Sequence, residues 1–418
     1  MNTLLSEPVV SESVRAQCRW AATPLRQRLQ IVRELRHQIA EEAGILAQAA
    51  AAVSNRPVAE KLVSEVLPLA EACRWLEKNA ALVLAPRRHG KRGRPLWLGG
   101  STFEVQRQPV GTVLVIGPGN YPLFLPAIHA LQALVAGNAV LLKPAPGTRA
   151  VANRFAQLTR AAGIDPALLS ILPESVEAAH DAISSGVDKV IFTGSSENGR
   201  EVLAVLAETN TPSVMELSGE DAVVVLADAD LDLVVQAVRF GTQLNDGETC
   251  IAPRRLFVVN SVADSLSDRL GGLLPITRVA DEAAAVEQVN AADYALGAAI
   301  FSRDIARAKM LAAQMKTGFV LINDMIVPTA DPRMPFGGVK ASGFGSTRGD
   351  EGLLEMTFPH VVAIRAGGLR PHFEASAPDD ARLFRSYIQM AHGRHPLRAV
   401  GEFFGAMQQK IKTRKPNS

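Results

Sequence analysis

Residues 109–122 read PVGTVLVIGPGNYP, and the apolar run Thr112–Ile116 inside them decides how this part of the chain folds. Five consecutive residues without polar alternation are typical of a strand that is buried on both faces. Two further apolar runs follow, Ala139–Leu142 and Lys189–Phe192. Helical stretches at 122–136 and 148–162 lie between the three runs. Strands that alternate with helices in this way predict βαβ units and a parallel sheet.

A second α/β series follows the region around Glu216. Its predicted elements are a helix at 231–243 and strands at Ala222–Leu226, Leu256–Val259, Leu274–Val279, Ala298–Phe301 and Phe319–Ile322. Upstream, Thr23 and Pro24 predict a helix start, with a capping hydroxyl followed by proline at the first helical position, and helical patterns continue to about residue 82. The alternating stretch Ser101–Gln108 predicts an exposed strand. We therefore expect an α/β protein with two doubly wound domains, a helical N-terminal part and a small β arm.

The chain has 418 residues, of which 47% are hydrophobic and 21% are charged. This length and composition predict a globular protein of two or three domains. The formal net charge of +2 gives no general field for nucleic acid, although residues 87–94 (RRHGKRGR) concentrate positive charge in one loop. Three scattered cysteines are too few for a disulfide framework, and no stretch reaches the length of a membrane span. We expect a cytoplasmic protein with no nucleic-acid partner.

The candidate nucleophile is Cys250, at the end of the polar stretch Asn245–Cys250 (NDGETC). A lone cysteine is more often a small buried hydrophobe, because free cysteine packs well in cores. The turn-forming residues around Cys250 favour a sulfur that meets a ligand instead. Glu216, in the stretch VMELSG, ends an apolar run, and its burial would raise its pKa toward the range of a general base.

An anion site is predicted where residues 192–199 read FTGSSENG. A buried strand ends there, Gly194 permits close backbone approach, and Ser195 can cap a helix over about 196–208. The free N–H groups of such a helix start favour an anion such as a pyrophosphate, although an ordinary capped turn gives the same pattern.

Two further stretches lie where a ligand can be expected. Lys143 ends a strand at the edge of the sheet where ligands bind in open α/β folds. Residues 334–345 (MPFGGVKASGFG) place Phe336 in a glycine-dense loop, where an aromatic ring can press against a flat ligand or the loop can be only a compact turn. His392 and His395 have helical spacing without cysteines or clustered carboxylates, so we expect no metal site.

Six motifs in order resemble those of the aldehyde dehydrogenase superfamily: PVGTVLVIGPGNYP, AGNAVLLKP, FTGSSENG, ELSG, NDGETC and PFGGVKASGFG. The resemblance covers roughly residues 20–365, and Glu216 and Cys250 lie 34 positions apart, as the general base and the nucleophile of the family do. The short N-terminus and the PGNYP form resemble the class-3 and coniferyl-type branch, which implies a homodimer held partly by strand exchange. The implied parts are a cofactor-binding domain (1–97 and 110–218), a shortened catalytic domain (219–356), an oligomerisation arm (98–109 and 357–368) and a helical tail (369–418).

The resemblance also implies the chemistry, which is oxidation of an aldehyde to a carboxylic acid with NAD or NADP. Cys250 as a thiolate would attack the carbonyl, and the Asn120 amide with the Cys250 N–H would hold the oxyanion. Glu216 would activate the water that hydrolyses the thioester. The implied cofactor-binding residues are Lys143, Gly194, Ser195, Gly199 and Phe336. No carboxylate follows Lys143 at Ala145 and Pro146 to repel a 2′-phosphate, so either nucleotide is expected.

The sequence also departs from the family pattern. Only 86 positions separate Cys250 from Phe336, and residues 273–278 (LLPITR) stand where the family's EExFGP motif, with its ribose-binding glutamate, would have ended. A catalytically weak or inactive binding subunit therefore stays open as an alternative, as does reductive conversion of an activated acyl group to an aldehyde. In the tail, apolar residues beside basic ones suggest contact with a membrane surface or a partner: Phe403, Phe404, Met407, Lys410, Lys412, Arg414 and Lys415.

Overall fold

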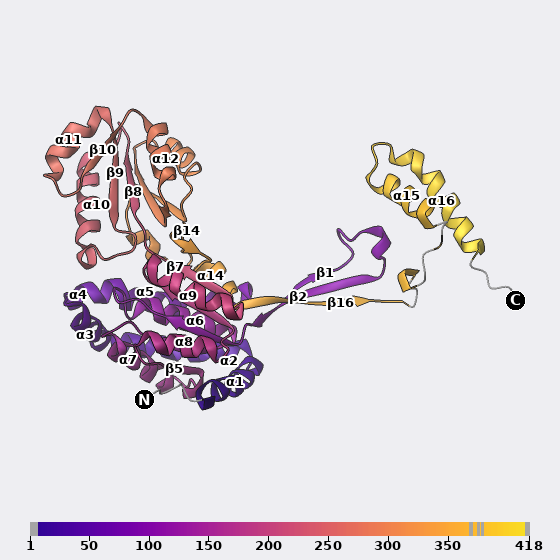
Figure 1. Ribbon diagram of the computed structural model, residues 1–418, viewed down its shortest axis with the longest axis horizontal. Coiled ribbons are helices and arrows are strands. Elements are labelled where there is room, and N and C mark those ends of the chain that lie inside the picture. Colours follow the sequence, from indigo (N-terminus) through magenta and orange to yellow (C-terminus); the bar gives the residue numbers. More distant parts are fainter. Residues whose placement is uncertain (1–6, 368–370, 374–376, 378–379, 414–418) are drawn as a thin grey trace. The chain divides into compact units, whose positions relative to one another are not determined.

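A computed structural model of the chain describes residues 7–367, 371–373, 377 and 380–413 (Figure 1). The chain divides into two compact units: Met1–Arg88 with Glu104–Val362, and His89–Phe103 with Ala363–Ser418. Two parallel sheets with their helices lie in the first unit, which confirms the predicted α/β class. The boundary predicted between a cofactor-binding and a catalytic domain falls inside this unit and stays a prediction.

The first sheet has six strands in the order β15-β7-β6-β3-β4-β5. Its strands are β3 (Thr112–Ile116), β4 (Ala139–Lys143), β5 (Leu169–Ile171), β6 (Lys189–Thr193), β7 (Ser213–Glu216) and β15 (Gly343–Phe344). Five strands run parallel, and β15 is added antiparallel at the edge beside β7. Every residue of β3, β4 and β6 is buried, as their unbroken apolar runs predict. The helices of this part are α6 (Phe124–Ala136), α7 (Arg149–Ala161), α8 (Val176–Ser184) and α9 (Ser196–Thr209).

The second sheet has five parallel strands in the order β10-β9-β8-β12-β13. They are β8 (Asp221–Val225), β9 (Pro253–Val259), β10 (Ile276–Val279), β12 (Gly297–Phe301) and β13 (Phe319–Ile322). Its helices are α10 (Leu231–Gln243), α11 (Asn260–Leu270), α12 (Glu282–Ala291) and α13 (Ile305–Ala312). After β13 the chain forms a short 3-10 turn, η5 (Val327–Ala330), the small strands β14 (Val339–Lys340) and β15, and then α14 (Gly349–Glu355). The strand β14 pairs with β11 (Tyr294–Ala295).

The N-terminal helices form a layer of their own. They are α1 (Glu7–Ala22), α2 (Leu25–Glu41), α3 (Ala43–Ser54), α4 (Val58–Lys61), a π-helical turn η1 (Leu62–Val66) and α5 (Leu67–Val83). The predicted cap at Thr23 is wrong. Its hydroxyl donates to the carbonyl of Arg19 in the last turn of α1, and α2 begins after Pro24 without a side-chain cap. A threonine that follows a helix can bond back to the i−4 carbonyl, and this contact competes with capping the next helix.

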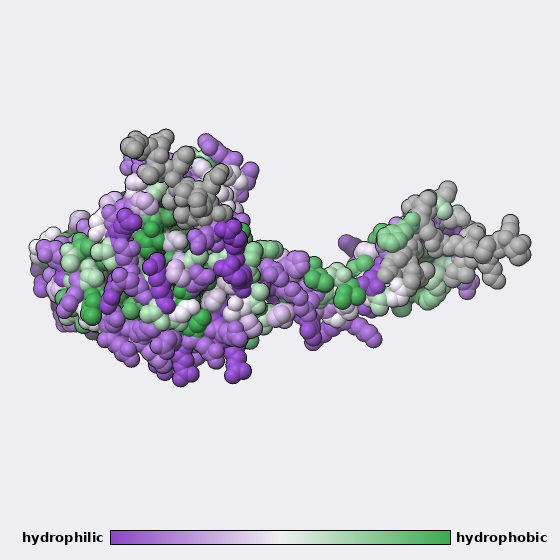
Figure 2. Space-filling model, turned by 90° about the horizontal axis from the view of Figure 1, so that it is seen from below, coloured by the Kyte–Doolittle hydropathy of each residue, from purple (hydrophilic) through white to green (hydrophobic). Residues whose placement is uncertain are grey.

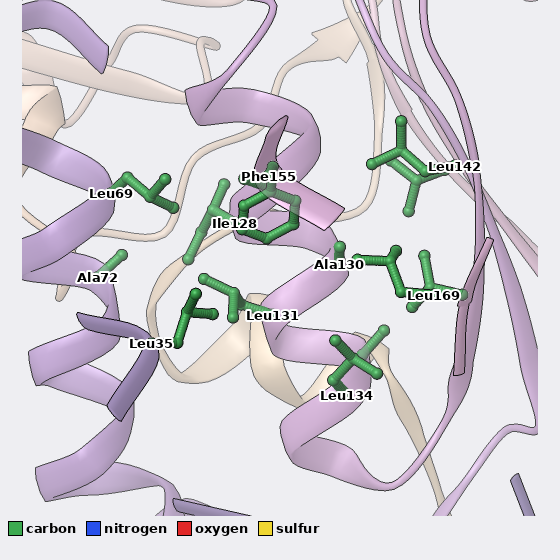
Figure 3. Packing of buried hydrophobic residues seen from close by; sticks show 14 of the residues in the cluster. Leu35, Leu69, Ala72, Ile128, Ala130, Leu131, Leu134, Leu142, Phe155 and Leu169 are labelled. Atoms are coloured by element: carbon green, nitrogen blue, oxygen red, sulfur yellow. The ribbon is translucent and has the colours of Figure 1, made fainter. Parts of the chain in front are cut away.

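The core of the first unit is built around α6, in which every residue is buried. A helix that is apolar all round needs neighbours on all sides. Figure 3 shows side chains from α2 and α5 packing on one side of α6 and strand residues approaching from the other. The residues labelled there come from α2, α5, α6, α7, β4 and β5: Leu35, Leu69, Ala72, Ile128, Ala130, Leu131, Leu134, Leu142, Phe155 and Leu169. The start of α6, next to Asn120, is thereby fixed between the helical layer and the sheet.

The predicted β arm corresponds to a three-stranded sheet in the order β1-β2-β16. Its strands are β1 (Arg87–His89), β2 (Ser101–Pro109) and β16 (Thr357–Arg365). Figure 2 shows apolar residues grouped along this sheet between hydrophilic stretches. The predicted tail contains α15 (Asp380–His392) and α16 (Pro396–Thr413), while Arg414 and Lys415 lie outside the described residues. None of the helices in the described part of the chain combines the length and the apolar character that crossing a membrane requires.

Truncating Leu131 to alanine tests the role of α6. Leu131 is 1% exposed, so Leu131→Ala should lower the free energy of unfolding by about 2–5 kcal/mol. Leu82 in α5 is 80% exposed and is the matched control, since Leu82→Ala should change that free energy by about 0.5 kcal/mol or less. Urea unfolding followed by circular dichroism measures both. Equal effects of the two substitutions would contradict this account of the core.

Candidate active site

The loop that carries Cys250 is a left-handed turn between α10 and β9. Within the 3-10 turn η4 (Leu244–Gly247), Asn245, Asp246 and Gly247 have φ values of 51°, 58° and 71°. Asparagine, aspartate and glycine are the residues that adopt this conformation most readily, which explains the NDG sequence. The turn ends three residues before the sulfur, and Cys250 itself is partly buried.

Asn245 connects this loop to the rest of the site. Its side-chain carbonyl accepts a hydrogen bond from Lys61 Nζ (3.1 Å), and its amide donates to the carbonyl of Asn120 (3.0 Å). The backbone N–H of Asn245 donates to Glu60 Oε1 (3.1 Å). Asn245 is 2% exposed, so these bonds are made in a dry environment. The loop that carries Cys250 is therefore held by the N-terminal helices and by the loop after β3.

Glu216 faces Cys250 from the end of β7. Its carboxylate Oε1 lies 3.8 Å from the Cys250 Sγ, and Oε2 accepts a hydrogen bond from the Thr193 hydroxyl (3.3 Å). Thr193 ends β6, the strand paired in register with β7 at Glu216, so the sheet itself positions this contact. Glu216 is 2% exposed, and its burial raises its pKa, as predicted from the apolar run before it.

The electrostatic environment of the thiol is mainly acidic. Burial raises the pKa of Cys250 well above its usual value, and Glu216 and Asp221 raise it further. Asp221 is also buried, and that burial raises its pKa to about 7. The guanidinium of Arg348 acts in the opposite direction and lowers the pKa of both Cys250 and Glu216. Forming the thiolate here therefore depends on nearby positive charge.

Asn120 lies beside the nucleophile loop. Its side-chain Nδ2 donates to the carbonyl of Glu248 (2.7 Å), and its Oδ1 accepts from the backbone N–H of Tyr121 (3.0 Å). The Tyr121 hydroxyl shares a hydrogen bond with the Thr249 hydroxyl (2.7 Å), next to Cys250. The side-chain amide of Asn120 has a second N–H for a further acceptor.

Two cavities meet at Cys250 and Glu216, and both residues line each of them. The first has a volume of about 530 Å³, and its lining includes Asn120, Lys143, Gly194 and Ser195. The second has a volume of about 580 Å³ and a largely apolar lining from the helical layer, α10 and η5. The structure thus brings six predicted site residues to the first cavity, with Cys250 and Glu216 at the junction of the two cavities.

The first cavity fits a dinucleotide. A Cβ on Gly194 would lie 2.7 Å from the ring of Phe192, so only glycine leaves this wall open. The helix α9 begins directly after it, and Ser195 caps that helix by accepting from the N–H of Asn198 (3.2 Å), which confirms the predicted helix start. The remaining N–H groups of the first turn favour a phosphate. Lys143 is mostly buried at the end of β4, where burial lowers the pKa of its ammonium and Glu174 raises it.

Two predicted cofactor-binding residues lie elsewhere. Gly199 is inside α9, and a Cβ there would lie 2.5 Å from the Leu217 side chain, so the glycine allows the helix to pack on the strand end. It does not line the first cavity. Phe336 lines the second cavity and not the first, and its backbone forms a β-bridge with Thr347. The expectation that both face the cofactor remains a prediction without support from this geometry.

Several functional neighbours were not predicted. Arg348, Tyr121 and the buried pair Lys61 and Glu65 contact the site but lie in no recognised motif, except for Tyr121 in GPGNYP. The only sequence signal for Arg348 is that it follows the glycine-dense stretch 334–345 by three positions. Lysine and glutamate four positions apart in a helix are common on surfaces, so their spacing gave no reason to expect burial.

Comparison with known proteins identifies the family whose sequence motifs this chain resembles. The model of the aldehyde dehydrogenase family matches residues 6–272 and 267–362. The chain is 27% identical to the 4,4′-diapolycopene aldehyde oxidase of a Methylomonas species over 429 residues (85% of this chain and 81% of that protein). It is 30% identical to the geranial dehydrogenase of Castellaniella defragrans over 334 residues (61% and 69%). The solved aldehyde dehydrogenase of Mycobacterium tuberculosis with NAD⁺ has the same fold, with a TM-score of 0.80, 23% identity and coverage of 86% and 90%.

The family match comes in two stretches that meet at residues 267–272. There α11 ends at Leu270, Gly271 and Gly272 follow it, and β10 begins at Ile276. This is the place where the sequence lacks the family's ribose-binding motif. The relatives are named as dehydrogenases and an oxidase of aldehydes, which favours neither the binding-subunit nor the reductive alternative. The chain belongs to the aldehyde dehydrogenase family and oxidises an aldehyde with NAD or NADP.

Proposed function

We propose that the aldehyde is oxidised through a covalent cycle on Cys250, assisted by Glu216 and Asn120. The observation that carries this proposal is the position of Cys250 and Glu216, 3.8 Å apart at the junction of the two cavities. A thiol at such a junction can meet an aldehyde from the apolar side and a dinucleotide from the other. Glu216 is within reach to accept the thiol proton as the sulfur becomes the nucleophile.

The acylation step uses Asn120. Attack of the thiolate on the carbonyl carbon gives a thiohemiacetal and places negative charge on the former carbonyl oxygen. The Asn120 amide, fixed by its bonds to Glu248 and Tyr121, has one N–H to donate to that oxygen, and the backbone N–H of Cys250 is the second donor. NAD or NADP, when bound by Lys143, Gly194 and Ser195, supplies the hydride acceptor.

The hydrolysis step uses Glu216. Loss of hydride leaves a thioester, which water must attack. A buried carboxylate with a raised pKa can take a proton from that water as its oxygen bonds to the carbonyl carbon. The C–S bond then breaks, the sulfur of Cys250 leaves and can take the proton back from Glu216, and the carboxylic acid is released. The hydrogen bond from Thr193 orients the carboxylate for this role.

We further propose that the substrate is a large apolar aldehyde. Val63, Leu67, Phe240, Leu244 and Val327 are among the residues that line the second cavity. Among the residues described along its wall, Arg348 is the only cation, and Phe336 and Phe124 lie against its guanidinium. Two relatives are named for geranial and for a diapolycopene aldehyde, which are apolar compounds. Others are named as putative succinate-semialdehyde dehydrogenases, so the choice between the classes needs a direct test.

We propose that the enzyme is a homodimer joined at β16. This strand is the last in its sheet, and an open edge with apolar side chains favours pairing with a second chain. Val361 and Ile364 are 55% and 63% exposed. A membrane contact by the tail is the weaker possibility, since Lys410 is paired with Asp380 within the tail. We also place the enzyme in the cytoplasm, which cell fractionation tests; Cys18, Cys73 and Cys250 are free thiols.

Replacing Glu216 by glutamine should separate the two chemical steps. Glu216→Gln should slow hydrolysis more than acylation, because the thiol can still lose its proton to solvent, so a single turnover of NADH should still form while the steady-state rate falls by about 10²–10⁴-fold. Stopped-flow absorbance at the NADH band measures both phases. Cys250→Ala should abolish the first turnover as well, and Cys18→Ala, at an exposed thiol, should leave both phases unchanged. An unchanged steady-state rate in Glu216→Gln, with hydrolysis limiting, would rule out the base role.

A comparison of decanal with succinate semialdehyde tests the substrate class. We expect kcat/KM to be about 100-fold or more higher for decanal, because an ionised carboxylate is costly to bury in an apolar cavity. Leu67→Glu should lower kcat/KM for decanal, whereas Leu82→Glu, on the same helix but outside the cavity, should not. Preference for succinate semialdehyde would refute the apolar class without refuting aldehyde oxidation.

Light scattering tests the homodimer. The protein should elute with a mass about twice 44.6 kDa, and Ile364→Lys should shift it toward the monomer. Met310→Lys is the matched control, because Met310 is also 63% exposed but lies on α13, away from the β16 edge. A monomeric wild-type protein would exclude the dimer. Co-sedimentation with anionic vesicles, lost on deletion of 396–418, would then identify a membrane surface as the partner.

A further inference from the structure

Arg348 is a buried cation in an unfavourable backbone conformation. It precedes α14 with φ 62° and ψ 175°, a region that residues other than glycine rarely adopt. Such outliers persist where the surroundings fix them, and they cluster at functional sites. Arg348 is 5% exposed. Its position is therefore determined by the packing around the second cavity.

The guanidinium of Arg348 has no direct ion-pair partner among the described residues, although Glu216 and Cys250 raise its pKa. Its carbon lies 4.2 Å from the ring centroid of Phe336 and 5.8 Å from that of Phe124, and Nη1 donates to the carbonyl of Thr329. The buried Nε has no hydrogen-bond partner. In the described part of the chain, no carboxylate lies within ion-pair distance of Arg348. Burial of a charge without an ion-pair partner is costly, so a buried arginine at this place points to a role in the site.

The groups around the thiol need a positive charge. The proposed cycle requires a thiolate at Cys250 in one step and a carboxylate at Glu216 in the other, although the two atoms are 3.8 Å apart. Asp221 adds a third acidic group, and burial raises the pKa of the Tyr121 phenol, so that this side chain stays neutral. Like charges at such a distance oppose one another's ionisation. Arg348 lines the second cavity together with Cys250 and Glu216, and its positive charge lowers the pKa of both groups.

We propose that Arg348 supplies the fixed positive charge that lets Cys250 and Glu216 ionise in their buried site. The inference rests on the nucleophile role proposed for Cys250. A guanidinium suits this task because it is the most basic side chain and stacks on aromatic rings. Burial lowers the pKa of Arg348, and the neighbouring Glu216 and Cys250 raise it, which favours the charged form. With Phe336 and Phe124 holding its plane, the charge stays at a constant place while the substrate enters and the product leaves. Arg348 therefore acts through its charge on Cys250 and Glu216, and the substrate does not need to touch it.

The pH dependence of Cys250 alkylation measures this effect without catalysis. Iodoacetamide reacts with the thiolate, and mass spectrometry of the peptide that contains Cys250 separates it from Cys18 and Cys73. The midpoint is the pH at which the alkylation rate of Cys250 is half its maximum. In Arg348→Met and Arg348→Gln this midpoint should rise by about one pH unit or more, because a positive charge is lost. Arg348→Lys should restore most of the shift.

Two controls accompany these variants. Arg28 is also a buried arginine with unpartnered nitrogens, but it lies in the helical layer, so Arg28→Met should leave the midpoint unchanged. Glu216→Gln should lower the midpoint, since a negative charge next to the sulfur is removed. Thermal melting of each variant confirms that it is folded.

Each outcome decides the proposal. A midpoint in folded Arg348→Met within about 0.2 units of wild type would overturn it, as would a loss of activity restricted to carboxylate-bearing aldehydes with an unchanged alkylation profile. If neither neutral variant folds, an unchanged midpoint in Glu216→Gln would overturn it, because charge at the site would then not control the thiol. Retained turnover in Cys250→Ala would refute the nucleophile role instead, and the alkylation profile would still report on Arg348.

Discussion

The buried ion pair between Lys61 and Glu65 is the interaction on which the site depends. Both side chains are fully buried, with Lys61 Nζ 3.2 Å from Glu65 Oε1. The other oxygen of Glu65 accepts from the backbone N–H groups of Leu123 and Phe124 at the start of α6, and Lys61 also donates to Asn245. A buried pair is stable only when such additional bonds satisfy both charges, and removal of one partner leaves the other uncompensated. One salt bridge thereby fixes the loops of Asn120 and Cys250 against the same helix.

The π-helical turn η1 explains how this pair reaches both loops. It covers Leu62–Val66, between the short helix α4 and α5, and it includes Glu65. A π-helical turn inserts extra backbone into a helix and often occurs at functional sites. The widened turn lies where the helical layer meets the second cavity, with Val63 in the lining of that cavity. The helical layer thus lines the cavity proposed for the substrate and also packs in the core, and its amphipathic sequence pattern did not reveal the first of these roles.

Much of the fold was predictable because buried parallel strands have a simple signature. The strands Thr112–Ile116 and Phe319–Ile322 were predicted with the bounds that the structure shows. The sequence did not reveal β5 as a strand, because Leu169–Ile171 is only three residues long and follows a 3-10 turn. In the site, motif residues such as Cys250 were found. Arg348 was missed because its importance arises from packing against Phe336, which no local pattern encodes.

The bonds that assemble the site join positions far apart in the chain. Asn120 and Glu248 are separated by 128 positions, and Lys61 and Asn245 by 184. Contacts of this range form late in folding, because the loops between them must close first. A nascent or partly refolded chain can therefore contain most of its helices and strands while Cys250 remains an ordinary thiol. In the proposed mechanism, the surroundings that activate Cys250 come into existence only when both sheets and the helical layer have docked, so the chain would not carry an activated sulfur while it is still incompletely folded.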